Sequence, residues 1–317
     1  MKKILITGLT GFAGTHLAHL LSQNPENSLS GTYYSQDSVE QLGDLAKSID
    51  LHKVDMTQKD QVDALIAATN PDEVYHLAAQ TSPSDSIKDP QATYLTNISS
   101  QSYLFEALKS HNNTKILIIS TSEIYGAVLS SDLPIDEDTP LRPVTPYAVS
   151  KIACDYMALQ YAIAEKMHII RVRPFNHIGP GQAPKFVLPS FAKQVAAIEK
   201  GEQEPVMKVG NLAARKDFSD VRDIVRAYVF LMEKGEAGDV YNVGAGKSVT
   251  IQDLLDMLLK QSKKEIRVEV DPQFFRPIDT PDVVCDTTKI ATLTGWKPEI
   301  SIEQTITDTL DYFRKVI

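Results

Sequence analysis

The sequence predicts an α/β protein with a doubly wound parallel sheet and a smaller α/β part toward the C-terminus. Two observations indicate this fold class. Short apolar runs alternate with segments of helical apolar spacing, and parallel strands need such helical crossovers. Beyond residue 174 the pattern changes to helices among short runs and polar loops. The apolar runs cover residues 3–7, 29–35, 51–56, 73–79, 115–120 and 168–173. The later helical segments cover residues 187–200, 221–234, 251–261 and 302–316.

The first element is an apolar strand that leads into a glycine-rich loop. Gly8, Gly11 and Gly14 follow the strand at three-residue intervals, and a helical pattern begins directly after them. A strand, spaced glycines and a helix form the context that a dinucleotide-binding loop of the Rossmann type requires. We expect Gly8 to make the tight turn, Gly11 to let backbone N–H groups approach a pyrophosphate, and Gly14 to pack helix against strand. The other loop residues expected to contact this cofactor are Thr10, Phe12 and Ala13.

The second apolar run bears on which dinucleotide binds. Proteins that bind NAD usually carry an acidic residue at the end of this strand, which binds the ribose 2′-hydroxyl. Residues 33–35 here read Tyr-Tyr-Ser instead. The missing acid favours NADPH, and the lack of a nearby arginine in the sequence leaves NADH acceptable. Tyr34 and Ser35 are the residues expected near the adenosine ribose.

The third and fourth runs supply further expected contacts with the cofactor. Asp55 ends the third run, where its carboxylate can accept a hydrogen bond from adenine or cap the helix that follows, and both roles are compatible. His76, in the fourth run, is expected to pack within its strand and not to act in catalysis. The remaining cofactor contacts that we expect are Met56, Leu77, Ala78, Ala79 and Pro174.

Four polar residues carry the predicted chemistry. Tyr147 and Lys151 are four residues apart in a helical segment, so they share one face, and a nearby cation lowers the pKa of a phenol. Thr121 and Glu123 follow the fifth apolar run, where strand alternation predicts that they point to the same side. Because ligands bind at the carboxyl ends of parallel strands, these four groups are expected to converge on the dinucleotide.

Composition restricts the class of partner. The 317 residues carry a net charge of −9, which argues against nucleic acid. The sequence shows no signal peptide, and no apolar run approaches the ~18 residues of a membrane span. With only Cys154 and Cys285, neither a disulfide framework nor a metal site is expected. These features predict a cytoplasmic protein that binds neither membrane nor metal.

Together these motifs resemble those of the extended short-chain dehydrogenase/reductase family over nearly the whole chain. The family pattern includes the three glycines, Thr121 ahead of Tyr125-Gly126, the Tyr147/Lys151 pair and the Arg-Pro-Phe-Asn run at 173–176. A narrower resemblance is to the GDP-mannose branch of that family. The segments that carry it cover residues 70–80, 120–123, 175–182, 210–212, 216–223, 275–277 and 295–298.

The resemblance implies an enzyme that uses NADPH to reduce the 4-keto group of GDP-4-keto-6-deoxy-D-mannose, forming GDP-D-rhamnose. It implies that Thr121 hydrogen-bonds the keto oxygen, that Tyr147 donates the proton, and that Lys151 lowers the phenol's pKa and holds the nicotinamide ribose. Glu123 is shared with the dehydratases of the branch, so 4,6-dehydration of GDP-mannose, alone or with reduction, is the alternative. The glycine loop and the loop after Asn176 depart from the dehydratase pattern and favour reduction. A non-catalytic NADP-sensing regulator is a third alternative, against which the complete set of catalytic groups argues.

The resemblance also implies how the chain is divided. Residues 1–174, with returning segments from about 210–245, are expected to form an NADP-binding Rossmann domain, and residues 175–317 mainly to bind the nucleotide sugar. A homodimer through the helices near Asn97 and Tyr147 is expected. Arginine suits a pyrophosphate because its guanidinium fork binds two oxygens at once. The expected contacts with the substrate are Asn176, Val187, Lys193, Arg215, Arg276 and Asp279.

Overall fold

The computed structural model describes residues 1–40, 42–274 and 282–317. At its centre, the described residues form a seven-stranded sheet in the order β10-β6-β5-β4-β1-β2-β3. Every neighbouring pair in it is parallel, which confirms the predicted doubly wound α/β fold. The strands are β1 (Lys2–Thr7), β2 (Asn27–Tyr33), β3 (Asp50–Lys53), β4 (Glu73–His76), β5 (Lys115–Ile119), β6 (His168–Pro174) and β10 (Val240–Val243).

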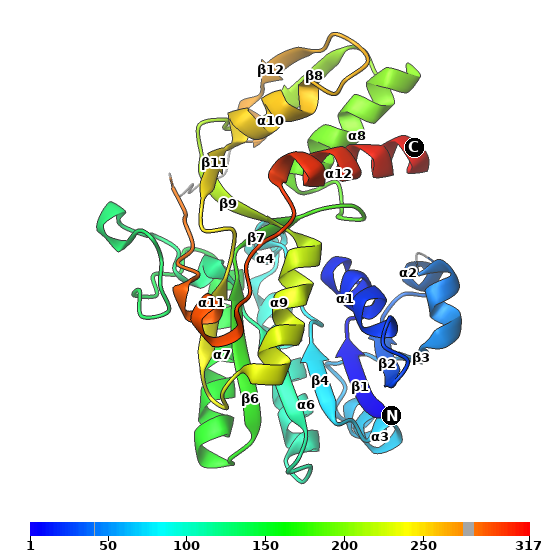
Figure 1. The fold of residues 1–317 in the computed structure, drawn as a ribbon, viewed down its shortest axis with the longest axis vertical. Helices are drawn as coiled ribbons and strands as arrows, with labels where there is room; N and C mark the ends of the chain where they lie inside the picture. The colour runs from blue at the N-terminus through cyan, green and yellow to red at the C-terminus, as the bar shows by residue number, and fades with distance from the viewer. Residues whose placement is uncertain (41, 275–281) are drawn as a thin grey trace.

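Helices cover both faces of this sheet (Figure 1). Along β1, Ile4 and Ile6 join the apolar cluster under one set of helices, whereas Leu5 joins the cluster under the other set. The sheet is therefore buried on both faces, which is why its strands read as nearly continuous apolar runs. The helices on one face are α1 (Phe12–Ser22), α9 (Val221–Lys234) and α11 (Thr288–Thr294). The helices on the other face are α3 (Lys59–Thr69), α6 (Ser100–Leu108) and α7 (Pro146–Ala164).

A smaller part with its own apolar core lies beyond the carboxyl ends of the strands (Figure 1). Its core is enclosed by three helices and two small sheets, ordered β11-β9-β7 and β12-β8. The helices are α8 (Val187–Lys200), α10 (Ile251–Leu259) and α12 (Ile302–Val316). The strands are β7 (Asn176–Ile178), β8 (Val206–Val209), β9 (Arg215–Asp220), β11 (Ser248–Thr250) and β12 (Arg267–Val270).

Short helical pieces complete the described chain. Those beside the sheet are α2 (Gln36–Glu40), α4 (Pro83–Lys88) and α5 (Pro90–Tyr94), followed by a π turn at Leu95–Ser99. The 3₁₀ turns are Gly43–Ser48, Ser122–Ile124, Ser130–Asp132 and Pro272–Phe274.

The sequence located the later helices well and the strand ends less well. The helices predicted at 187–200, 221–234 and 302–316 have these limits, and α10 ends at Leu259, two residues before its predicted end. In contrast, β4 ends at His76 and β5 at Ile119, earlier than predicted. The small and polar residues after each strand therefore belong to loops, which places them at the carboxyl edge of the sheet.

Candidate active site

The glycine loop has the shape that a dinucleotide phosphate requires. Gly8 has a φ of +68°, and a Cβ on it would stand 2.9 Å from the Cα of Ala78. A Cβ on Gly14 would stand 2.5 Å from the carbonyl oxygen of Gly8, so only glycine lets α1 approach β1 this closely. Gly11 caps α1 without a side-chain hydrogen bond, and the first turn of α1 carries no acidic residue. The N–H groups of that turn can therefore bind an anion.

The pair of residues expected to act in catalysis lies at the start of α7. Thr145 caps this helix, because its hydroxyl accepts a hydrogen bond from the backbone N–H of Ala148 at 3.1 Å. Tyr147 and Lys151 are both buried one turn apart. The ammonium of Lys151 donates to the carbonyl of Ile119 at 2.7 Å, at the end of β5. Packing of α7 on the sheet therefore brings both groups to the carboxyl edge, as the sequence predicts.

The pKa of Tyr147 differs from the expectation. Burial raises the pKa of this phenol above its ordinary value, and the neighbouring Thr121 hydroxyl offsets part of that rise. Burial also lowers the pKa of Lys151. The cation was expected to lower the pKa of the phenol, but in this structure its ammonium is directed at Ile119 and desolvation dominates at Tyr147.

Thr121 and Glu123 reach the site by a route that strand alternation did not predict. Because β5 ends at Ile119, Thr121 is not a strand residue but the N-cap of the 3₁₀ turn Ser122–Ile124. Its hydroxyl accepts a hydrogen bond from the backbone N–H of Glu123 at 3.2 Å. Strand alternation is therefore not what positions the two side chains, although both lie near Tyr147 and Glu123 also lines a pocket.

That pocket encloses about 160 Å³ at the carboxyl edge of the sheet. Of the residues predicted to act on or bind the substrate, Glu123 and Asn176 line it. The sequence analysis missed several polar lining residues: Ser82, Ser84, Ser122, Thr145, Lys185 and Lys216. Ser82 had a recognisable signal, because Ser-Pro is typical of a helix start and Ser82 caps α4. The two lysines had none, since they come close to Glu123 only through tertiary folding.

Three of the other expected substrate residues, Val187, Lys193 and Arg215, do not line this pocket. Val187 begins α8, and Lys193 is exposed on the same helix. The Arg215 guanidinium contacts Ser248 at 3.0 and 3.2 Å and the carboxylate of Asp282 at 3.7 Å. The other two expected contacts, Arg276 and Asp279, lie outside the described residues.

The expected cofactor residues beyond the glycine loop are distributed over the edge of the sheet. Tyr34 is 74% exposed just after β2. The carboxylate of Asp55 accepts from both the N–H and the hydroxyl of Thr57, so it closes a turn, while Gln58 is the N-cap of α3. The hydroxyl of Ser38 hydrogen-bonds the carbonyl of Ser35 and lies 2.9 Å from the hydroxyl of Thr10. Other expected residues lie as follows: Met56 and Pro174 are buried, and Leu77, Ala78 and Ala79 are half-buried after β4.

His76 packs within β4, as expected. It is buried, its Nδ1 lies 2.8 Å from the hydroxyl of Thr7, and burial lowers its pKa to about 3. The Thr7 hydroxyl also accepts from the N–H of Ala78 at 3.2 Å. A neutral imidazole therefore helps to hold the β4 loop against the glycine loop.

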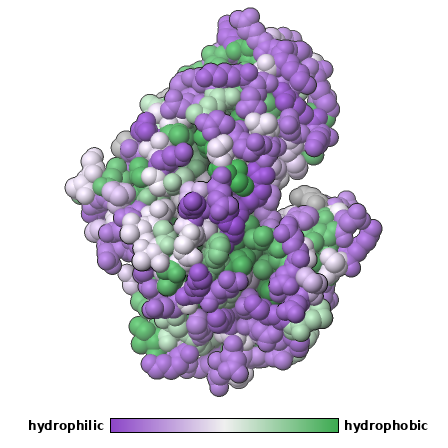
Figure 2. Space-filling model, in the orientation of Figure 1, coloured by the Kyte–Doolittle hydropathy of each residue, from purple (hydrophilic) through white to green (hydrophobic). Residues whose placement is uncertain are grey.

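A second pocket, of about 210 Å³, lies at the opposite end of the sheet between α1 and α9. Figure 2 shows hydrophobic surface where these two helices meet. The salt bridge of Lys2 with Glu73, at 2.9 Å, stands at this pocket. Tyr147 and Lys151 are not among the residues that line either of these two pockets.

Within residues 1–40, 42–274 and 282–317, no helix combines the length and the apolar character that a membrane span needs. The same ranges contain no group of three or more His, Cys, Asp or Glu side chains that could hold a metal ion.

Known proteins resemble this chain over nearly its whole length. The chain matches the family model described as GDP-mannose 4,6 dehydratase over residues 5–309. It is 35% identical to the GDP-6-deoxy-D-mannose reductase of Pseudomonas aeruginosa over 96% of this chain and 95% of that protein. It is 28% identical to the GDP-mannose 4,6-dehydratase of Sinorhizobium fredii over 99% and 98% of the two chains. The structure of RMD from Pseudomonas aeruginosa complexed with NADPH superposes over 100% of both chains, with a TM-score of 0.87 and 33% identity. The chain thus belongs to the GDP-mannose 4,6 dehydratase family, the branch that its motifs resemble.

Proposed function

We propose that this protein reduces the 4-keto group of GDP-4-keto-6-deoxy-D-mannose with NADPH and forms GDP-D-rhamnose. The observation that carries the proposal is the buried Tyr147 next to a pocket lined by Glu123 and Asn176. The chain that carries this site aligns almost end to end with a GDP-6-deoxy-D-mannose reductase.

The residues present fit a dinucleotide cofactor. Gly8 and Gly14 let the loop and α1 pack directly on neighbouring backbone, and the first turn of α1 lacks a side-chain cap. These N–H groups would hold the pyrophosphate, and Tyr34 and Ser35 would lie near the adenosine ribose. NADPH is the preferred cofactor, as in the related structure with NADPH, and NADH is accepted because the second strand ends with neither an acid nor an arginine.

Tyr147 and Thr121 supply the groups that reduction of a carbonyl needs. When bound, NADPH supplies the hydride that reduces the carbonyl carbon. Tyr147 then donates its phenolic proton to the carbonyl oxygen, while the Thr121 hydroxyl hydrogen-bonds the same oxygen. The phenol of Tyr147 lies within hydrogen-bond reach of the Thr121 hydroxyl, so the two groups can contact one carbonyl oxygen. Lys151, whose ammonium donates to the carbonyl of Ile119, would hold the nicotinamide ribose when the cofactor is bound.

Dehydration of GDP-mannose is the second candidate, favoured by one observation. Glu123 lines the pocket, where a carboxylate could remove the C5 proton after oxidation at C4. The chain is less similar to this dehydratase relative, at 28% identity, than to the reductase relative, at 35% identity. We therefore assign reduction as the main reaction.

We also propose that the two parts of the chain divide the ligands. Residues 1–174, with segments from about 210–245, would hold the cofactor, and residues 175–317 would mainly hold the nucleotide sugar. The separate apolar core of the smaller part supports this division. A reducing, cytoplasmic location is supported by Cys154 and Cys285, which are both buried and free.

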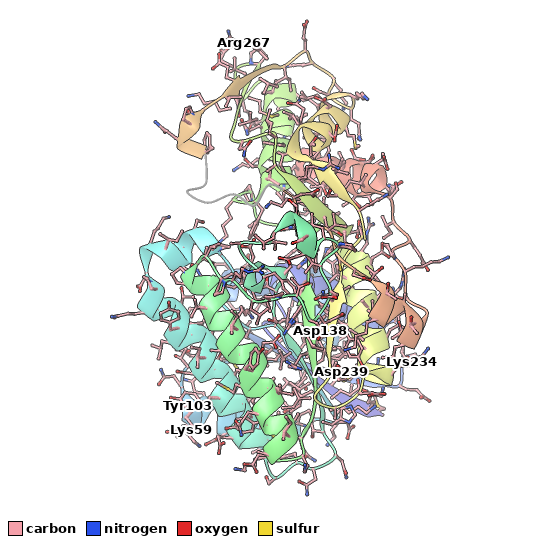
Figure 3. All side chains as sticks on the ribbon, turned by 90° about the vertical axis from the view of Figure 1, so that its left-hand side faces the viewer. Lys59, Tyr103, Asp138, Lys234, Asp239 and Arg267 are labelled. Carbon is pink, nitrogen blue, oxygen red and sulfur yellow. The ribbon has the colours of Figure 1, made fainter. Side chains whose placement is uncertain are left out.

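A homodimer is supported by an exposed apolar stripe on α7. Val149, Tyr156 and Ile163 are seven residues apart and exposed, so they lie along one side of the helix. Leu95 is exposed on the adjoining π turn, which packs against α7. Figure 3 shows α7 facing the viewer, with α6 beside it. An apolar stripe of this kind is typical of a protein interface. Light scattering tests the dimer: we expect the wild type to be dimeric and Tyr156→Glu to be monomeric.

The test of the function is product identification. The protein is incubated with NADPH and freshly made GDP-4-keto-6-deoxymannose, and the sugar formed is identified by NMR. We expect GDP-D-rhamnose. In a parallel reaction with GDP-mannose and NADP⁺, we expect little 4-keto sugar. Rapid conversion of GDP-mannose, with no reduction of the keto sugar, would show a dehydratase instead.

A further inference from the structure

One loop touches both the substrate pocket and the helix that starts at the glycine loop. Asn176 lines the pocket at one end of this loop, and Lys185 and Phe186 line it at the other end. Between these ends, residues 177–180 leave the pocket and pack on the first turns of α1. The loop therefore lies between the expected cofactor site and the expected sugar site.

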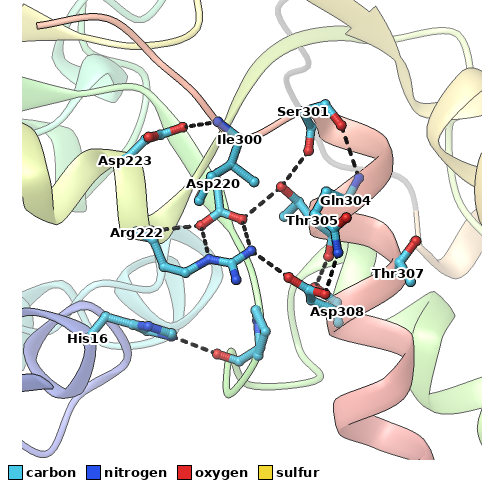
Figure 4. Close-up of polar contacts among 12 residues, drawn as sticks. His16, Asp220, Arg222, Asp223, Ile300, Ser301, Gln304, Thr305, Thr307 and Asp308 are labelled. Atoms are coloured by element: carbon cyan, nitrogen blue, oxygen red, sulfur yellow. Dashed lines mark hydrogen bonds and ion pairs between the residues drawn. The ribbon is translucent and has the colours of Figure 1, made fainter. Parts of the chain in front are cut away.

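Two side chains of α1, one turn apart, hold the middle of this loop. The Phe12 ring stacks on the His177 ring, with centroids 5.9 Å apart and planes 5° apart. A Cβ built on Gly179 stands 3.7 Å from Cζ of Phe12, so the ring also covers this glycine. His16 meets Phe12 edge-on at 5.5 Å, and its Nε2–H donates to the carbonyl of Pro180 at 2.9 Å (Figure 4).

The loop transmits this contact to the pocket wall. The ring of His177 donates from Nδ1 to the carbonyl of Phe175 at 3.1 Å, and its own carbonyl accepts from Nε2 of Gln182 at 3.0 Å. Asn176 lies between Phe175 and His177, which are joined by the first of these hydrogen bonds. Its position in the pocket therefore depends on where the His177 ring is stacked.

Phe12 also belongs to the expected phosphate site through its backbone. It is the first residue of α1 after the cap Gly11, so its N–H is one of the groups that α1 leaves unpaired within the helix. A phosphate bound by this turn fixes the residue whose ring holds the loop. One residue therefore contacts the cofactor through its backbone and the substrate loop through its side chain.

We propose that Phe12 is a positioning residue that couples the cofactor site to the nucleotide-sugar pocket through the Phe12–His177 stack and the His16–Pro180 hydrogen bond. Binding of the dinucleotide tightens binding of the nucleotide sugar, and the reverse holds by the same factor. This inference rests on the proposed function, because it takes GDP as the nucleotide in the pocket.

The test measures binding without turnover. Calorimetry gives the Kd of GDP for the full chain with and without saturating NADP⁺, and the Kd of NADP⁺ with and without GDP. In the wild type we expect each ligand to lower the Kd of the other by about fivefold or more, which is the usual lower range of such coupling. In Phe12→Ala and Phe12→Leu the factor falls below about twofold, whereas His177→Phe, which preserves a stacked ring, retains most of it.

Two histidines on α1 provide a matched pair of variants, because His16 contacts the loop and His19 does not. His16→Ala removes the bond to Pro180 and reduces the coupling, whereas His19→Ala, an exposed position on the same helix, leaves it unchanged. Wild-type coupling in folded Phe12→Leu overturns the inference, as does a wild type that binds both ligands independently. A wild type that binds NADP⁺ but no GDP overturns the proposed function instead.

Discussion

The catalytic helix depends on a buried ion-pair cluster, which supports a quantitative prediction. Asp155, one turn after Lys151 on α7, is fully buried and accepts hydrogen bonds from two arginines of β6. Arg171 donates at 2.7 Å, and Arg173 donates at 3.0 and 3.1 Å. Arg173 also donates to the hydroxyl of Tyr125 at 3.0 Å. This cluster holds α7, and with it Tyr147 and Lys151, against the sheet.

We predict that Asp155→Asn lowers the free energy of unfolding by about 3–5 kcal/mol. The change preserves the shape of the side chain but leaves two guanidinium groups, with side chains only 8% and 4% exposed, without their counter-charge. Breaking a buried pair from one side typically costs this amount, out of a total stability of about 5–15 kcal/mol. At roughly 2–4 °C per kcal/mol, the melting temperature falls on the order of 10 °C.

Thermal and urea unfolding followed by circular dichroism measure this change, and reduction assays on the folded protein at low temperature follow the catalytic effect. The control is Asp63→Asn, which removes the surface pair with Lys59 on α3. We expect that change to stay within about 0.5 kcal/mol. If Asp155→Asn destabilises the protein no more than Asp63→Asn does, the cluster is not what anchors α7.

Four further predictions concern the site. Tyr147→Phe keeps the ring but loses the proton, so turnover falls roughly a hundredfold or more with little change in NADPH affinity; near-normal turnover in steady-state kinetics contradicts the assignment. Glu123→Gln retains most of the reduction, because reduction needs no base at C5; loss of a rapid reaction with GDP-mannose on this change would instead indicate a dehydratase. Arg276→Ala weakens GDP-sugar binding by about 2–3 kcal/mol and spares NADPH, whereas equal loss of both ligands in calorimetry means a damaged fold. Because burial lowers the folded-state pKa of His76 to about 3, only the unfolded state takes up this proton between about pH 6.5 and 3, and stability falls by ~1.4 kcal/mol per pH unit as the pH drops below 6.5. His76→Asn flattens that dependence in urea titrations from pH 7.5 to 5, and an unchanged slope refutes the assignment.

Much of the site could be predicted because it depends on residues close in sequence. The spacing of the glycines determines a turn and a close approach, and both appear at Gly8 and Gly14. The four-residue spacing of Tyr147 and Lys151 places them on one helix face whatever surrounds the helix. Ser82-Pro83 is likewise a local signal for the start of α4.

The remaining features depend on contacts between distant residues. The exact end of β5 decides that Thr121 caps a turn, and that end is set by pairing with β6 and not by the residues of β5 alone. Lys185 reaches the pocket beside Glu123 through the loop after β7 and forms an ion pair with Asp85 across the chain, at 3.1 Å. Neither position has a periodic signal in the sequence.

The sequence by itself determined the alternation of strands and helices, the phosphate loop and the helix that carries Tyr147, because each follows from backbone conformation and apolar spacing over a few turns. Only the tertiary structure decided the pKa values of these groups and the contacts that their side chains make. Burial by distant elements raises the pKa of Tyr147, and the end of β5 supplies the carbonyl that holds Lys151. The contact of Phe12 with His177 joins residues 165 positions apart. Desolvation and long-range hydrogen bonds arise from three-dimensional packing, and local sequence patterns do not encode them.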